Sequence, residues 1–265
     1  MGFDKYLQNP SISLRILHVS QYRNPEDFKG KRVMVIGLSH SGSQIASELA
    51  NTASSVISVF RSPRWIIEKN IKSDIYNKKL PWDVMLLSTK ELREAFDKMK
   101  LDERHRARSG VLDQFSENNK IGGPFQKDNY SDSPFLFGVS DHYFGCVKKG
   151  SIKPVKSEIK TIEGNIVKLY NGEDYEIDEL IICTGYDVDF SFLDQALLKS
   201  LNYDPKNKRN PVELDGNFVY NSNVKNLAFV GLMPYDVTIF TNEFQAGNQF
   251  SQEHRERKKK DERRT

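Results

Sequence analysis

Short apolar runs alternate with polar turns along the first sixty residues. Residues 31–36 pass from two basic side chains into a continuous apolar run, which is typical of a buried strand. Residues 37–42 break this run with glycines, residues 43–50 place apolar side chains at helical spacing, and residues 56–60 form a second apolar run. A strand, a glycine turn, a helix and a second strand in this order predict a βαβ unit with a right-handed crossover.

The second half of the chain has a different pattern. After a less regular middle, in which residues 91–108 have a charged helical pattern, the sequence changes to short alternating strands. The dipeptide Asn171-Gly172 is a signal for a two-residue hairpin. Residues 180–183 predict a buried strand that stops at Thr184-Gly185, and residues 227–230 predict a further strand.

The turn at residues 37–42, Gly-Leu-Ser-His-Ser-Gly, matches the dinucleotide fingerprint GxGxxG except that Ser39 replaces the second glycine. Gly37 permits the tight turn, Gly42 lets the helix approach the strand, and a small residue at Ser39 lets the backbone come close to a pyrophosphate. The free N–H groups at the start of the helix then face the phosphates. The alternative is a glycine turn in a βαβ unit that binds no ligand.

The residues after the second predicted strand indicate which dinucleotide would bind. NAD-binding units usually have an acidic residue there, which binds the ribose hydroxyls. This chain has Arg61-Ser62-Pro63-Arg64, with no acid before Glu68. A guanidinium binds a 2′-phosphate through charge-assisted, bidentate hydrogen bonds. We therefore expect NADP(H), with Arg61 as the first contact and Arg64 as a second. The alternative for either arginine is that it only solvates the strand end.

Composition narrows the class of protein. Apolar residues make up 38% and charged residues 28% of the 265 residues, as in a globular protein. The net charge of +3 equals the excess of seven Lys and Arg over four Asp and Glu in residues 253–265, so the rest of the chain offers no basic face to nucleic acid. No run approaches the roughly 20 apolar residues that span a bilayer, and the first residues show no apolar signal core. We expect a cytoplasmic protein with neither a nucleic-acid nor a membrane partner.

The chain has two cysteines, Cys146 and Cys183. They are too few for a disulfide framework, and neither has a Cys or His neighbour at the spacing of metal ligands. Cys183 lies in an apolar run, which favours a small buried side chain over a nucleophile. We expect no metal site.

Four further segments, together with the glycine turn, resemble a known family. His18 and Tyr22 form a His-x-x-x-Tyr pair shortly before the turn, and residues 182–186, Ile-Cys-Thr-Gly-Tyr, end the later buried strand. Residues 226–231 and 243–246 have the pattern of a strand and a helix start. In this order the segments resemble the flavin-containing monooxygenases and the related Baeyer–Villiger enzymes.

The resemblance implies two cofactors and a reaction. Such enzymes bind FAD and NADPH on two Rossmann-like domains, reduce the flavin with NADPH, and transfer one oxygen atom of O2 to a soft nitrogen or sulfur nucleophile. On this mapping the phosphates and ribose of NADP(H) would contact Ser41, Gly42, Ser43 and Gln44. The hinge between the two domains would contain Thr184 and Gly185.

The histidines receive weaker assignments. His40, inside the turn, either contacts the pyrophosphate or points to solvent. His18 is expected to be a structural hydrogen-bonding residue rather than a general base, because oxygen transfer from a flavin needs little side-chain acid–base chemistry. The catalytic residues stay unassigned.

The expected fold is α/β. A Rossmann-like NADPH-binding βαβ domain would cover residues 31–145. The C-terminal part of a second Rossmann-like domain, of the FAD type and with a β-meander, would cover residues 146–250. Residues 1–30 would form a lead-in segment and residues 251–265 a charged tail.

The resemblance is incomplete at the flavin site. The family's FAD fingerprint lies upstream of the segments matched here, and the chain contains no second GxGxxG. Three alternatives follow: an NADPH- and FAD-dependent monooxygenase whose FAD-binding half comes from a separate chain, a non-catalytic NADP(H)-binding module, or an inactive truncated remnant. A flavin-free NADPH reductase is disfavoured, because such an enzyme needs a proton donor such as a Tyr-x-x-x-Lys pair. In this chain the residue four positions after Tyr170 is Asp174 and not lysine.

Overall fold

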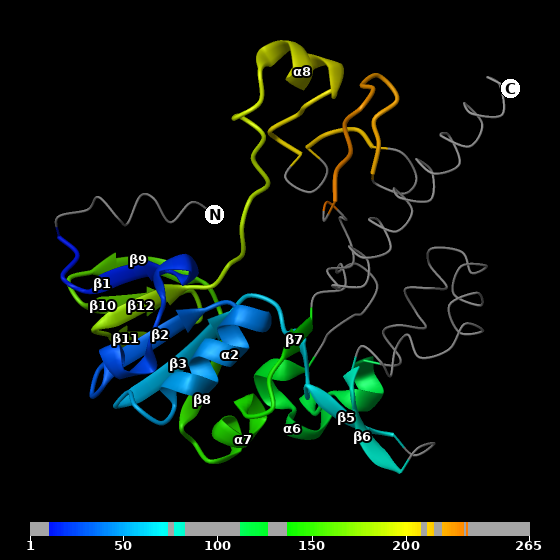
Figure 1. Ribbon diagram of the computed structural model, residues 1–265. Helices are drawn as coiled ribbons and strands as arrows, with labels where there is room; N and C mark the ends of the chain where they lie inside the picture. Colours follow the sequence, from blue (N-terminus) through cyan, green and yellow to red (C-terminus); the bar gives the residue numbers. More distant parts are fainter. Residues whose placement is uncertain are drawn as a thin grey trace, which may run out of the picture. The chain divides into compact units, whose positions relative to one another are not determined.

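The computed structural model describes residues 11–73, 77–82, 112–126, 137–207, 211–214, 219–230 and 232. The chain divides into two compact units, the first ending at Thr184 and the second beginning at Gly185. The first unit is mixed α/β and is built on a parallel sheet, so the expected fold class is confirmed (Figure 1).

Five parallel strands form the main sheet of the first unit, in the order β1-β12-β2-β3-β8. They are β1 (Arg15–His18), β2 (Arg32–Ile36), β3 (Ser55–Phe60), β8 (Ile152–Lys156) and β12 (Glu179–Ile182). Starting from β2, the chain adds β3 and β8 on one side and returns on the other side with β12. This is the strand order of one half of a doubly wound dinucleotide-binding fold, extended by β1.

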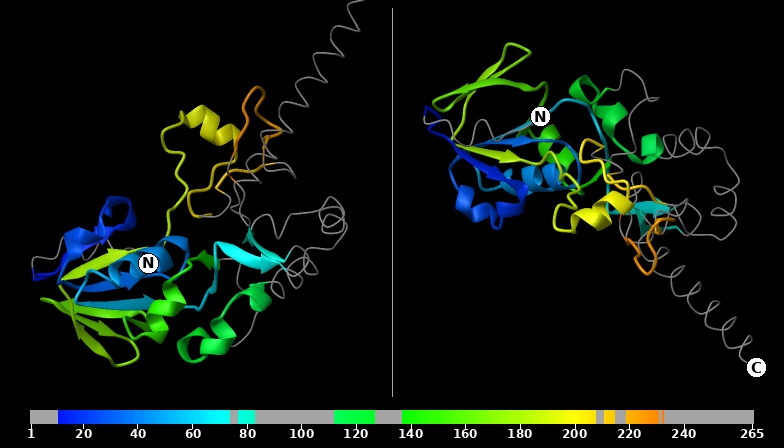
Figure 2. Two further views of the ribbon diagram at one scale, coloured as in Figure 1. Left: turned by 60° about the horizontal axis from the view of Figure 1, so that its bottom comes forward. Right: turned by 90° about the horizontal axis from the view of Figure 1, so that it is seen from above.

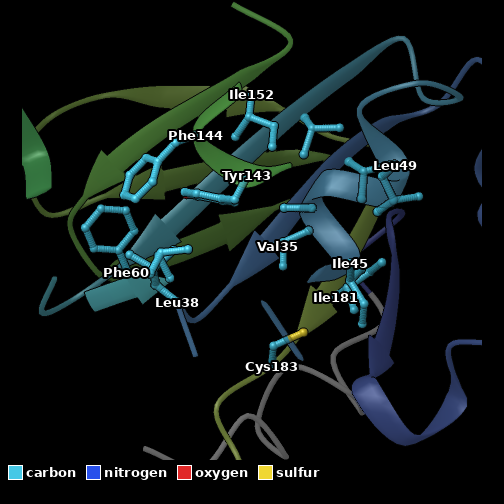
Figure 3. Close-up of a cluster of buried hydrophobic side chains, with 14 of the residues drawn as sticks. Val35, Leu38, Ile45, Leu49, Phe60, Tyr143, Phe144, Ile152, Ile181 and Cys183 are labelled. Atoms are coloured by element: carbon cyan, nitrogen blue, oxygen red, sulfur yellow. The ribbon is translucent and has the colours of Figure 1, made fainter. Parts of the chain in front are cut away.

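Helices cover one face of this sheet. α2 (His40–Leu49) connects β2 to β3, and α7 (Tyr143–Lys148) leads into β8. Ile45 and Leu49 of α2 lie in one buried cluster with Val35 and Ile181 of the sheet (Figure 3). Burying each such side chain contributes about 1.5–3 kcal/mol, so the apolar stripe of α2 holds this short helix in place.

A three-stranded antiparallel meander covers the other face. It consists of β9 (Ile159–Glu163), β10 (Ile166–Leu169) and β11 (Asp174–Glu176). Met34 of β2 is buried against the meander, whereas its neighbours Val33 and Val35 are buried on the helix side. Both faces of β2 are therefore covered, which explains its continuous apolar run. The right-hand view of Figure 2 shows α2 and the meander on opposite sides of the sheet.

The predicted hairpin at Asn171-Gly172 forms and joins β10 to β11, but its turn is longer than the predicted two residues. Leu169 donates its N–H to the carbonyl of Glu173 (2.9 Å), which leaves Tyr170, Asn171 and Gly172 in the loop, and of these only Gly172 has a positive φ, +88°. The predicted strands at residues 31–36, 56–60 and 180–183 correspond to β2, β3 and β12. The predicted helix corresponds to α2, which begins three residues earlier than residue 43, inside the glycine turn.

Shorter elements complete the described part of the chain. The 3₁₀ helices η1 (Val19–Gln21) and η2 (Pro25–Phe28) lie between β1 and β2. Between β3 and α7 the chain forms β4 (Trp65–Ile67), β5 (Asn70–Ser73), β6 (Lys78–Pro81), α6 (Asn118–Ile121), η3 (Gly123–Phe125) and β7 (Phe137–Val139). β4 pairs in parallel with β7, and β5 pairs antiparallel with β6. α8 (Gln195–Ser200) belongs to the second unit.

The division of the chain differs from the boundary expected near residue 145. β8 and β12 lie beyond that boundary in the sequence, yet they pair with β3 and β2 of the βαβ unit. The meander packs on the same sheet. The compact units therefore divide after Thr184, because the return strand of the doubly wound fold comes only after the meander.

The strand predicted at residues 227–230 is absent from the described residues around it. Phe229 donates its N–H to the carbonyl oxygen of Val219 (2.8 Å), and its ring is buried with Phe190 and Leu198 of the second unit. Burial in this cluster, rather than sheet pairing, accounts for the apolar run. Residues 91–108, 243–246 and 251–265 lie outside the described residues.

Candidate nucleotide-binding site

The glycine turn lies at the carboxyl ends of three neighbouring strands. It follows β2 directly, and the N–H of Gly37 donates to the carbonyl of Val59 near the end of β3 (2.8 Å). The N–H of Cys183, after β12, donates to the carbonyl of Ile36 (2.7 Å). Open parallel sheets bind ligands at the carboxyl ends of their strands, where the strand order reverses. The order reverses at β2, so the turn occupies this position.

Neither glycine of the turn has room for a side chain. A β-carbon on Gly37 would lie 2.3 Å from the carbonyl oxygen of Cys183, and Gly37 has φ +109°. A β-carbon on Gly42 would lie 2.0 Å from the carbonyl oxygen of Gly37. The first contact brings the turn against β12, and the second brings the first turn of α2 against the end of β2. These contacts are the physical reason for glycine at both positions.

The start of α2 has no side-chain cap. Ser39 is the N-cap residue, but its side chain makes no capping hydrogen bond; its hydroxyl instead donates to the carbonyl of Phe137 (3.4 Å). The Ser39 carbonyl accepts hydrogen bonds from the N–H (3.0 Å) and the hydroxyl (2.9 Å) of Ser43. A helix start without a side-chain cap leaves its first N–H groups open to an anion.

The predicted contacts along this first turn differ in exposure. Ser41 and Gln44 are exposed, whereas Gly42 and Ser43 are buried. The Gln44 amide donates to Glu48 one turn later (3.2 Å). Ser41 and Gln44 are therefore accessible to a ligand, whereas the side chain of Ser43 is engaged with the helix start.

His40 is the first residue of α2 and lies beside β7. Its ring is exposed on one side and packs on the ring of Phe137 on the other, with centroids 5.1 Å apart. The protein around it lowers the pKa of the His40 imidazole through partial burial. The neutral ring keeps one N–H donor. Contact with a pyrophosphate and exposure to solvent both fit this position.

Arg61 follows the last residue of β3 and is exposed. Over the described ranges, no hydrogen bond or ion pair engages its guanidinium. Arg64 is half-buried, and its carbonyl accepts a hydrogen bond from the amide nitrogen of Asn118 (2.7 Å). The Asn118 amide oxygen accepts from the N–H of Ile66 (3.2 Å). The buried Asn118 thus holds the backbone that continues from the two arginines.

Thr184 and Gly185 lie on either side of the division between the two units. Both are exposed, and Gly185 has φ +92°. The preceding Cys183 is buried, and burial raises the pKa of its thiol to about 12. The thiol is therefore protonated at neutral pH and is no nucleophile. The hinge role of Thr184 and Gly185 and their contact with a cofactor both stay predictions.

His18, the last residue of β1, and Tyr22, which follows η1, each make a side-chain hydrogen bond. Nδ1 of His18 accepts a hydrogen bond from the N–H of Ser20 (3.3 Å) and caps η1. The Tyr22 hydroxyl donates to the carboxylate of Glu48 in α2 (3.0 Å). Burial, followed by this carboxylate, raises the pKa of Tyr22. Tyr22 therefore anchors the segment before β2 to α2, and His18 caps η1 within that segment.

Comparison with known proteins decides the family. The family model described as flavin-binding monooxygenase-like (FMO-like) matches residues 10–247. The chain belongs to the FMO-like family. This family member is 30% identical to flavin-containing monooxygenase 3 of the dog, Canis lupus familiaris, over 196 residues, which cover 71% of the chain and 34% of the relative.

A human relative gives a similar match. The FMO-like chain is 30% identical to the putative dimethylaniline monooxygenase (N-oxide-forming) 6 of Homo sapiens over 210 residues, which cover 76% of the chain and 34% of the relative. The chain thus spans about a third of the length of the curated relatives that it matches.

Two solved structures share the fold of the FMO-like chain. The flavin-containing monooxygenase from Stenotrophomonas maltophilia has a TM-score of 0.50 at 16% identity, with 89% of this chain and 55% of that chain covered. A mutant form of a flavin monooxygenase from the same organism has a TM-score of 0.51 at 16% identity, with 91% and 56% covered. At this identity the likeness concerns the fold.

The described part of the FMO-like chain lacks two kinds of feature. No helix there is both long enough and apolar enough to cross a membrane. Within the same residues, the side chains of His, Cys, Asp and Glu form no group of three that could hold a metal ion.

Two residues near the turn had no place in the sequence-based prediction. Asn118 fixes the segment after Arg61, as described above, and its sequence context carries no signal for this. Gly138 of β7 contacts the start of α2: a β-carbon on it would lie 2.9 Å from the hydroxyl of Ser43 and 3.2 Å from the carbonyl oxygen of Ser39. The available hint was a glycine within an apolar run, which often marks a close approach of backbone.

Proposed function

We propose that the chain binds NADP(H), with the pyrophosphate on the first turn of α2. The observation that carries this proposal is the uncapped start of α2, directly behind two glycines that have no room for a β-carbon. Backbone N–H groups and the positive end of the helix dipole favour a phosphate at such a helix start. Gly37 and Gly42 let the helix start come close to β2, and the exposed Ser41 and Gln44 lie where phosphates and ribose would bind.

The selectivity for NADP(H) over NAD(H) rests on Arg61. Its guanidinium is exposed at the end of β3, and no acid follows it before Glu68. A 2′-phosphate would therefore meet a bidentate donor and no nearby carboxylate in the sequence. Arg64 is the second candidate, held in place through its carbonyl by Asn118. Thr184 and Gly185, between the units, are proposed to move when the nucleotide binds.

The reaction that this binding serves is the oxygenation of a small, soft nitrogen or sulfur nucleophile. Membership of the FMO-like family supports it, and the human relative is named for N-oxide formation. When bound, NADP(H) supplies a hydride, and the residues of this chain bind and orient it. Neutral His40 can donate a hydrogen bond beside the phosphates, and Tyr22 holds Glu48 and thereby α2 in place.

The residues of this chain do not fit a second dinucleotide. The sequence has one glycine turn of this kind, and NADP(H) would occupy it. In this first candidate function, residues outside this 265-residue stretch supply the FAD-binding half.

The single glycine turn also favours a second candidate function. A module that binds NADP(H) without flavin would need the same turn and the same arginines, and would catalyse no oxygenation. An inactive remnant would share the fold and bind neither cofactor. The monooxygenase and the NADP(H)-binding module are both expected to bind NADP(H). They differ in whether added FAD-binding protein restores oxygenation.

A thermal-shift experiment on the purified 265-residue chain tests the binding. NADPH should raise the melting temperature more than NADH at equal concentration, because a ligand that binds only the folded state stabilises it. The absorption spectrum tests the flavin assignment in the same sample. A colourless preparation is expected, and a stoichiometric yellow preparation with near-ultraviolet and blue flavin bands would show that this chain holds FAD.

A further inference from the structure

β7 runs beside the first two turns of α2 and contacts them at several points. The Ser39 hydroxyl donates to the carbonyl of Phe137 (3.4 Å), and the rings of His40 and Phe137 pack together. Further along, the hydroxyls of Ser47 and Ser140 are 3.1 Å apart. These contacts join residues 39–47 to β7 and to Ser140, the residue that follows β7.

Gly138 lies where the two elements leave no room for a side chain. A β-carbon on it would lie 2.9 Å from the Ser43 hydroxyl oxygen and 3.2 Å from the Ser39 carbonyl oxygen. On the other side it would lie 2.7 Å from Cδ1 of Ile66 in β4, which pairs with Gly138 in register. The φ of Gly138 lies outside the left-handed range, so its backbone accepts any residue. Space, and not conformation, requires glycine here.

The atoms that Gly138 approaches are those that close the start of α2. The Ser39 carbonyl oxygen accepts both the N–H and the hydroxyl of Ser43. A displacement of Ser39 or of the Ser43 hydroxyl would therefore tilt the first backbone N–H groups of α2. Binding groups that are displaced by a fraction of an ångström lose much of their effect.

We propose that β7 positions the nucleotide turn, and that Gly138 is the residue that allows it to do so. The strand supports Ser39, so that the phosphate-binding N–H groups of α2 are held before the ligand arrives. Gly138 is thus a positioning residue that touches no ligand. The inference rests on the proposed binding of NADP(H), and it adds a support that lies far from the glycine turn in the sequence.

The test is a set of variants of the full chain, with the NADPH dissociation constant measured by calorimetry and the melting temperature measured alongside. Gly138→Ala should raise the dissociation constant about tenfold, because the new methyl group displaces the helix start. Gly145→Ala is the matched control: Gly145 is exposed in α7, and a β-carbon on it would have no atom within 4 Å. Its dissociation constant should equal that of the parent chain.

Two second-site substitutions separate positioning from core packing. Ser43→Ala removes the hydroxyl that the new methyl group would meet on the helix side, and Ile66→Val removes Cδ1 on the β4 side. In a double-mutant cycle on the dissociation constant, Gly138→Ala should cost clearly less in the Ser43→Ala background than in the parent chain. Ile66→Val should restore melting temperature while leaving the loss of affinity in place.

The outcomes distinguish this inference from the proposed function. If the parent chain binds no NADPH, the proposed function fails and this inference fails with it. If the parent binds and folded Gly138→Ala binds equally well, or if Ile66→Val alone restores its affinity, the positioning role is overturned and the proposed function stands. Should Gly138→Ala fail to fold, the double variant with Ile66→Val lacks the closest clash and carries the same test, with the Ile66→Val chain as its reference.

Discussion

The carbonyl oxygen of Gly37 lies 2.0 Å from the point where a β-carbon on Gly42 would be. This contact brings the first turn of α2 directly against the end of β2. It leaves no room for a side chain between the turn and the helix start. The proposed nucleotide site depends on this closeness, since it directs the first N–H groups of α2 toward the carboxyl ends of the strands.

Replacing Gly42 tests the contact. Gly42→Ala should lower the free energy of unfolding by about 1–3 kcal/mol, as overpacked sites usually do, and should abolish the stabilisation by NADPH. Urea unfolding with and without nucleotide measures both effects. The control Gly145→Ala should leave stability unchanged or raise it by up to about 1 kcal/mol, because alanine is the better helix former. Equal stability of the two variants would contradict the close contact.

Replacing Arg61 tests the choice of nucleotide. Arg61→Glu removes the bidentate donor and places a carboxylate where NAD-binding units have one, so the preference for NADPH over NADH should disappear. Thermal shifts with both nucleotides measure the preference. Lys160→Glu in the exposed outer part of β9 makes the same change of net charge away from the site and should preserve it. An unchanged preference in Arg61→Glu would remove Arg61 from its assigned role.

Asn118 should matter for stability more than an ordinary amide. Its side chain bridges the carbonyl of Arg64 and the N–H of Ile66, both on the segment after β3. Asn118→Ala leaves the buried N–H of Ile66 and the partly buried carbonyl of Arg64 without this partner, so the free energy of unfolding should fall by about 1–3 kcal/mol. Gln195→Ala, at an exposed position in α8, should change it by less than about 0.5 kcal/mol. If urea unfolding gave the same small change for both, the bridge would have no energetic role.

Asp178 gives the stability a predictable dependence on pH. The side chain and the backbone N–H of Arg32 hydrogen-bond its carboxylate (2.6 and 2.8 Å) and hold its pKa at about 2, below the ordinary value of 3.8. A carboxyl whose pKa is lower in the folded state stabilises the fold above the unfolded pKa. That contribution should be lost as the pH falls from about 4 to about 2.

The matching experiment compares the parent chain with Asp178→Asn. The variant should be the less stable one at pH 7, and the difference in urea midpoint should shrink steadily below about pH 4. Asp174→Asn, at an exposed position, is the control. Asp194→Asn would not serve, because the Asp194 side chain caps α8. A difference for Asp178→Asn that stays constant down to pH 2 would show that the pair with Arg32 does not set the pKa.

The sequence predicted the local parts of the site and missed the parts that depend on distant residues. Gly37 and Gly42 act within six positions of each other, so their pattern is visible in the chain. Asn118 and Gly138 reach the same region through tertiary packing, which no local period records. The pairing of β12 with β1 and β2 likewise joins residues that are far apart in the sequence. This pairing is the reason that the compact unit ends at Thr184 instead of near residue 145.

The strand predicted near Phe229 shows the limit of apolar runs. A short apolar run is compatible with a strand or with irregular backbone buried in a cluster, and periodicity does not separate the two. By contrast, the strand at Val33–Ile36 was predicted well, because the glycine turn and the helical pattern that follow it are compatible only with a strand at this position. The strongest predictions came from several adjacent signals that agreed.

Calorimetric titration of the parent chain with NADPH tests the central claim most directly. We predict a saturable heat of association with NADPH and a dissociation constant at least about tenfold lower than that for NADH, which corresponds to about 1.4 kcal/mol for the 2′-phosphate contact. No heat of association with NADPH, even at millimolar concentration, would contradict the proposal that the first turn of α2 and Arg61 form a nucleotide-binding site.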